Sequence, residues 1–126
     1  MRQILIVMST LLCLAVPPAR AQQQGSPAPF DPDLQRLAEI LGALSYLRPI
    51  CGANEGAKWR NEMQALIDAE VPDGERRKKV ITAFNRGYRG FQQTYRTCTP
   101  AANIAIRRYL DEGAKIAREI TARYAN

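Results

Sequence analysis

Apolar residues recur at three- and four-residue steps in four successive segments of this chain, the spacing of one buried face of an α-helix. We predict helices over residues 31–48, 54–70, 75–98 and 100–126. The longest face in register belongs to the third segment, at Val80, Phe84, Gly87, Tyr88, Phe91, Tyr95 and Cys98. Each helix is therefore expected to bury one stripe and to expose the remainder.

Capping residues and prolines set the expected helix ends. Asp31 precedes Pro32, the arrangement of an N-cap acid followed by a proline in the first turn. Pro49 is expected to end the first helix, because the residue before a proline is disfavoured in the helical region. Asp73 is placed to cap the third helix, and Thr99 followed by Pro100 repeats the start signal for the fourth.

The connections between these helices are short, so consecutive helices are expected to be antiparallel neighbours. The predicted fold is all-α, a small antiparallel four-helix bundle over residues 31–126, preceded by a flexible linker over 22–30. Gly87 and Gly113 lie on the apolar faces of their helices, and close approach of the third and fourth helices is the expected reason.

Residues 1–21 have the pattern of a cleaved signal peptide. Arg2 supplies the positive start, an apolar stretch follows, and Ala19-Arg20-Ala21 fits a cleavage site after Ala21. The apolar stretch is about a dozen residues, shorter than the ~20 that a spanning helix needs. We therefore expect an exported, periplasmic protein without a transmembrane anchor after processing.

Two cysteines, Cys51 and Cys98, remain in the processed chain. An even pair in an exported chain predicts a disulfide, with free thiols or an intermolecular bridge as the alternatives. Each cysteine follows the end of a helix that runs in the same direction in the predicted bundle. The predicted fold therefore brings both to one end.

Charge is distributed unevenly. Residues 76–108 contain nine basic side chains and no acidic one, whereas residues 31–75 carry a net negative charge. Arginines favour phosphates and carboxylates, which the guanidinium group bonds at two points. The candidate residues for an anionic partner are Arg86, Arg89, Arg96, Arg107 and Arg108. The alternative is that acids of the first two helices neutralise this charge within the fold.

Catalytic chemistry has little support in this composition. The chain has no histidine, and with both cysteines oxidised a thiolate metal site is also excluded, so no cofactor or metal is expected. An envelope hydrolase using helix-borne carboxylates is the alternative, with Glu39, Glu62 and Asp68 as candidates. A third reading is a structural protein–protein interaction module, which an exposed Trp59 or Tyr124 would favour.

Several segments together resemble a family of small secreted alphaproteobacterial proteins that is catalogued as a domain of unknown function. The segments are LRPICG, which begins at Leu47, the pair Trp59-Arg60 followed by Met63, AFNRGYRGF, which begins at Ala83, and TYRTCTP, which begins at Thr94. The resemblance covers nearly all of the processed chain. It implies a periplasmic location and the two-cysteine framework, and it implies no activity, substrate or catalytic residue.

The function predicted from the sequence is a non-catalytic accessory or binding module of the bacterial cell envelope. Its partner is expected to be an anionic component, such as a lipid headgroup, lipopolysaccharide or the cell-wall polymer, or an acidic periplasmic protein. Nucleic acid suits the basic composition but not the compartment.

Overall fold

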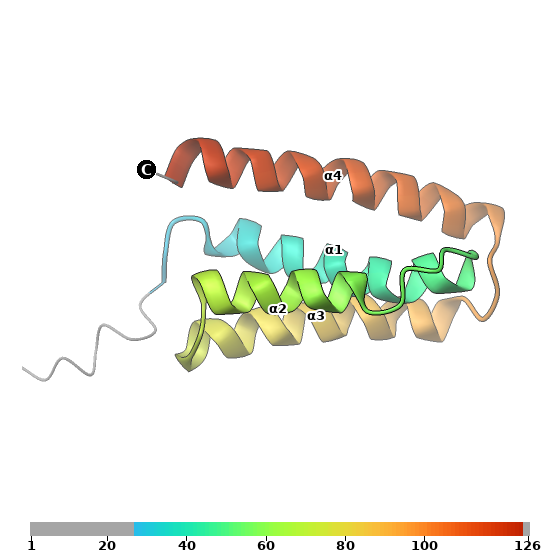
Figure 1. Cartoon of the computed structure of the whole chain (residues 1–126), viewed down its shortest axis with the longest axis horizontal. Coiled ribbons are helices and arrows are strands. Elements are labelled where there is room, and N and C mark those ends of the chain that lie inside the picture. The colour runs from blue at the N-terminus through green and yellow to red at the C-terminus, as the bar shows by residue number, and fades with distance from the viewer. Residues whose placement is uncertain (1–26, 125–126) are drawn as a thin grey trace, which may run out of the picture.

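The computed structural model describes residues 27–124, which form four α-helices and no strand. The helices are α1 (Asp31–Ile50), α2 (Lys58–Glu70), α3 (Gly74–Thr94) and α4 (Pro100–Tyr124). Figure 1 shows α1 and α3 running in one direction and α2 and α4 in the other. The described part is thus all-helical, as predicted, and none of its helices is long and apolar enough to cross a membrane. The predicted signal peptide and residues 22–26 of the linker lie outside the described residues.

Helix α1 is the centre of the fold. It lies next to each of the other three helices, whereas α2 also approaches α3, and the backbone of α4 approaches that of α1 alone among the described elements. Buried residues therefore extend beyond the predicted stripe of leucines and Ile40, and the additional ones are Ala38, Gly42, Ala43 and Ser45. A helix covered on several sides has to be apolar on several sides. The expectation that every pair of consecutive helices would pack closely is wrong for α3 and α4, whose backbones stay apart and which meet through side chains such as Phe91 and Tyr109.

The glycines on the apolar helix faces allow close contacts with α1. The prediction that they mark a close approach of α3 to α4 is therefore wrong. A Cβ atom at Gly87 would lie 2.0 Å from the backbone oxygen of Glu39 in α1. Gly42 of α1 has the reciprocal position, 2.0 Å from the backbone oxygen of Phe84. Gly113 of α4 faces the side chain of Ile40, again in α1. The contact between α1 and α3 is consequently backbone against backbone.

The core divides into two clusters that α1 joins. One cluster lies among α1, α2 and α3 and includes Leu34, Leu41, Met63, Ile67 and Val80. The other lies between α1 and α4 and includes Ile40, Leu44, Leu47, Ala102, Ile106 and Ile116. Burying these side chains is the main favourable contribution to folding, at about 1.5–3 kcal/mol for each large aliphatic residue.

Three predicted helix ends differ from the structure. Helix α1 continues through Pro49 to Ile50, because Cys51 N–H donates to the Leu47 carbonyl and closes the last turn. Helix α2 begins at Lys58 rather than at residue 54. Helix α3 ends at Thr94, where Tyr95 turns to an extended conformation, so Cys98 lies beyond the helix.

The predicted disulfide is present in the described fold. Cys51 and Cys98 have an S–S distance of 2.15 Å and a Cα–Cα distance of 4.8 Å. Cys51 follows α1, and Cys98 lies in the segment that connects α3 to α4. The Tyr46 hydroxyl also donates a hydrogen bond to the Tyr95 carbonyl near this end. The disulfide therefore ties the start of α4 to the end of the central helix.

Candidate functional site

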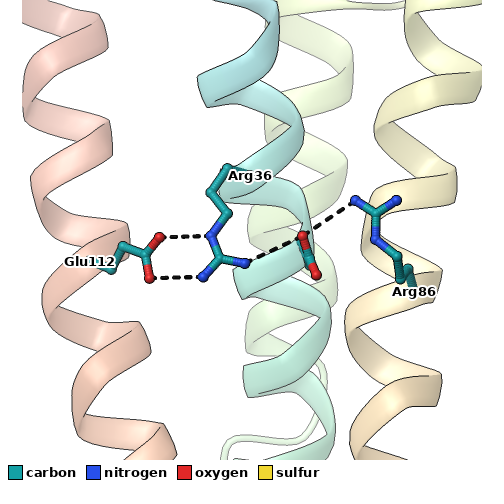
Figure 2. Close-up of polar contacts among 4 residues, drawn as sticks. Arg36, Arg86 and Glu112 are labelled. Atoms are coloured by element: carbon teal, nitrogen blue, oxygen red, sulfur yellow. Dashed lines mark hydrogen bonds and ion pairs between the residues drawn. The ribbon is translucent and has the colours of Figure 1, made fainter.

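An alternating row of charges connects three helices, and Figure 2 shows three of its members labelled. Arg36 of α1 donates to both carboxylate oxygens of Glu112 in α4, at 2.7 and 3.0 Å. Glu39 of α1 forms an ion pair with Arg36 at 3.4 Å and accepts a hydrogen bond from Arg86 of α3 at 3.3 Å. The bonds with Glu112 raise the pKa of Arg36 above its ordinary value and lower the pKa of Glu112. Arg86 is thus one predicted site residue whose charge is partly compensated inside the fold.

Acidic residues near the helix ends neutralise two more arginines. Arg76 forms an ion pair with Asp31 at 2.6 Å, and this bond lowers the pKa of the Asp31 carboxyl. Arg48 forms a two-point ion pair with Glu55, which also accepts from the Trp59 indole N–H at 2.7 Å. The Arg48 bonds lower the pKa of Glu55 to about 2. Internal neutralisation, the alternative raised by the sequence, therefore applies to part of the basic charge.

The remaining predicted arginines are exposed and have no carboxylate within ion-pair distance in the part of the chain that the structure describes. They are Arg89, Arg96, Arg107 and Arg108. Arg107 and Arg108 are consecutive in α4, so their side chains leave the helix about 100° apart. We define the basic surface as Arg86, Arg89, Arg96 and Arg108; Arg107 is left out because, unlike Arg108, it does not line the groove between α3 and α4.

A groove of about 380 Å³ lies beside this surface, between the end of α3 and the start of α4. Arg108 lines it together with Arg36 and Glu112, which form an ion pair with each other. Its aromatic residues contact one another: the Phe91 ring centroid is 6.0 Å from that of Tyr95 and 5.6 Å from that of Tyr109. The Arg36 guanidinium carbon lies 5.5 Å from the centre of the Tyr109 ring. The groove therefore joins cationic groups to aromatic ring faces.

A larger and mainly apolar groove of about 560 Å³ runs between α2 and α4. These two helices make no contact with each other among the described elements, and α1 forms the floor between them. Sequence reasoning missed this groove, because helical periodicity identifies a buried face without saying which neighbour covers it. Trp59 lines the groove and is half-buried, so it is not the exposed aromatic residue that would favour an interaction module. The side chain of Tyr124 lies outside the described residues.

The three candidate acids have different surroundings. The Glu39 carboxylate forms ion pairs with Arg36 and Arg86. Asp68 is exposed, and its carboxylate accepts a hydrogen bond from the Gln64 side-chain amide at 2.8 Å. Glu62 lines the groove between α2 and α4, as does Glu70. These two acids are eight residues apart on one helix, about 12 Å along its axis, which exceeds the ~5–9.5 Å between the carboxyl groups of a glycoside hydrolase. No group of three or more potential metal ligands occurs within the described residues.

Comparison with known proteins gives a family and no activity. Residues 29–124 match the family described as protein of unknown function (DUF2385), so the chain belongs to that family. This agrees with the resemblance found in the sequence as far as a family of unknown function. No curated protein and no solved structure matches the chain.

Proposed function

We propose that this member of the DUF2385 family is an exported, non-catalytic module that binds an anionic component of the bacterial cell envelope through the basic surface. The observation that carries the proposal is a division among the arginines. Arg36, Arg48 and Arg76 each have a carboxylate partner at hydrogen-bond distance. Arg89, Arg96 and Arg108 are exposed without one in the described structure.

The chemistry of these side chains favours phosphate or carboxylate groups. An arginine that is already matched by an acid gains little from a further anion, because the two anions compete for the same donors. An unmatched, solvated arginine keeps all of its N–H groups for an external partner. Arg86 is intermediate, since its side chain is 61% exposed although it touches Glu39. The partner is therefore expected to contact Arg89, Arg96 and Arg108 first.

Export is the second part of the proposal. It rests on the signal-peptide pattern of residues 1–21 and on the bond between Cys51 and Cys98. Disulfides persist in oxidising compartments, of which the bacterial periplasm is one. We therefore place the processed protein in the periplasm as a compact antiparallel four-helix bundle. The envelope polymers and lipids that it meets there are rich in anionic groups.

Vesicle binding measured across a salt series tests the basic surface. We expect the protein to sediment with vesicles that contain anionic lipid, to release as salt rises, and to ignore neutral vesicles. Changing Arg89, Arg96 and Arg108 together to Gln should remove most of this binding. A control with the same charge change, Arg60, Arg118 and Arg123 to Gln, should retain it, because these exposed residues lie outside the basic surface.

Equal vesicle binding by the two triple variants would show that the basic surface is not the binding site. Vesicle binding that salt does not weaken would show that the mechanism is not electrostatic. Purified anionic cell-wall polymer in place of vesicles separates a polymer partner from a lipid headgroup. A hydrolase is the less supported function, because Glu62 is the one candidate acid that lines a groove and the next acid there is too far away to assist it.

A further inference from the structure

The groove between α2 and α4 is not explained by the basic surface, since none of the residues of that surface lines it. Its floor consists of leucine side chains from α1: Leu37, Leu41 and Leu44. Its walls carry small side chains, which keep the groove open where larger ones would fill it: Ala65 and Ala69 of α2, and Ala114 and Ala117 of α4. Apolar side chains therefore line the groove along most of its length.

The dimensions of this groove limit what can occupy it. The lining residues of α2 extend from Lys58 to Glu70, about 18 Å along the helix axis. The volume of about 560 Å³ lies within the ~300–1,000 Å³ that is usual for small-molecule sites. The groove thus suits an elongated apolar molecule such as a single extended hydrocarbon chain.

Charge at the groove distinguishes its two ends. Lys58 is the one cation that lines the groove, at the start of α2, and no carboxylate lies within ion-pair distance of it in the described residues. Its Nζ lies 4.8 Å from the centre of the Trp59 ring. Helix α2 also begins without a side-chain cap, so the positive end of its dipole faces the same region. Two acids of α2 also line the groove, Glu62 one turn beyond Lys58 and Glu70 at the opposite end, and they disfavour an anion away from Lys58.

We propose that this groove binds a single-chain anionic amphiphile, of which a long-chain fatty acid is the simplest. Its carboxylate lies beside Lys58, and its hydrocarbon chain follows the leucine floor toward Glu70. Burying the chain supplies the affinity, because each methylene group leaves water for an apolar surface. Lys58 supplies the preference for an anionic head group. This inference is independent of the proposed envelope binding, which uses other residues on α3 and α4.

Trp59 provides a direct readout, because it is the only tryptophan in the chain and it lines the groove. We expect palmitate to change the emission of Trp59 saturably, and affinity to rise with chain length from octanoate upward until the groove is full. Hexadecanol should bind more weakly than palmitate, and hexadecylamine most weakly of the three. Absence of saturable binding by any of them, or tightest binding of the amine, would overturn the proposal.

Two substitutions separate the roles of shape and charge. Changing Ala114 and Ala117 to Leu narrows the groove from the exposed wall of α4 and should weaken palmitate binding by about tenfold or more. The matched control changes Ala101 and Ala122 to Leu, two exposed alanines of α4 outside this groove, and should bind palmitate as the unaltered protein does. Equal melting temperatures of the two double variants show that a loss is not due to misfolding.

The charge test is Lys58→Met, which preserves an apolar side chain without the ammonium group. We expect it to lose the preference for palmitate over hexadecanol while still binding hexadecanol. A preference that persists in Lys58→Met would overturn the assigned head-group position, and unchanged palmitate binding by the narrowed groove would overturn the site itself. If the narrowed variant does not fold, the comparison of head groups with Lys58→Met still decides the question.

Discussion

Gly42 of α1 and Gly87 of α3 each lie against the backbone of the other's helix, so that neither position has space for a methyl group. A Cβ atom would be 2.0 Å from a carbonyl oxygen in both cases. The obstructing atoms are main-chain atoms, which cannot move aside as a flexible side chain can. The closeness of α1 to α3, the most extensive helix contact in the fold, therefore depends on these two residues.

Gly42→Ala and Gly87→Ala should each destabilise the protein by about 3 kcal/mol or more, because the two helices have to move apart. Gly90→Ala is the control: no atom lies within 4 Å of its added Cβ, and alanine favours the helix by about 0.5–1 kcal/mol. Denaturant unfolding monitored by circular dichroism measures all three. Similar gains in stability at Gly42, Gly87 and Gly90 would show that helix propensity rather than space determines the effect.

Removal of the disulfide should cost about 4 kcal/mol, because the bond closes a loop with a sequence separation of 47 residues in the unfolded chain. The measurement compares unfolding of the double variant Cys51→Ser with Cys98→Ser against that of the oxidised protein. Reduction of the unaltered protein should give the same loss. A double variant as stable as the oxidised protein would mean that the unfolded chain gains no freedom when the bond is absent.

Acid should remove the contribution of the ion pair between Glu55 and Arg48. The pKa of Glu55 is lowered from 4.5 to about 2 in the folded protein by hydrogen bonds from Arg48. A group with a lowered folded pKa stabilises the protein above its unfolded pKa and loses that contribution as the pH falls through the folded one. The contribution is up to about 3 kcal/mol, present above pH 4.5 and lost on going to pH 2.

Glu55→Gln tests this expectation. The variant should be less stable than the original protein at pH 7, and the difference should shrink as the pH falls toward 2. Asp111→Asn serves as the control, because Asp111 is exposed and has no ion pair among the described residues. A difference between Glu55→Gln and the original protein that is constant from pH 7 to pH 2 would contradict the ion pair as its cause.

The pair of Arg36 with Glu112 should contribute about 1 kcal/mol of coupling, because it is bonded at two points yet partly solvated. The two side chains are 38% and 39% exposed. A double-mutant cycle with Arg36→Met and Glu112→Gln measures the coupling. The single-point pair of Lys115 with Glu119, at 3.9 Å, should give about 0.3 kcal/mol in the same experiment. Equal couplings would mean that bond geometry does not matter here.

The sequence predicts the elements of this fold better than their arrangement. The periodicity of Val80, Phe84 and Gly87 locates α3, and the helix directions bring Cys51 and Cys98 to one end. The same periodicity does not say which helix covers a given face. The central position of α1 is therefore visible only in three dimensions, although its buried residues on every side are the signal that indicates it.

The candidate sites show the same limit. Arginines that lack a nearby acid in the sequence can find one across the fold, as Arg86 does with Glu39 at a separation of 47 residues. No nearby acid distinguishes it from Arg89, which has no such partner in the described structure. The groove between α2 and α4 depends on the absence of a contact between two helices, and a helical pattern contains no signal for that absence.

The backbone of α4 approaches one helix only, and this has a consequence for the motions of the protein. The amide hydrogens of α4 are expected to exchange with deuterated water sooner than those of α1, because α4 is less extensively packed than α1. The disulfide between Cys51 and Cys98 keeps α4 close to α1 when the two helices separate. We expect this separation to widen the groove next to Trp59 while the other three helices stay folded, which would give a long, flexible ligand a route of entry.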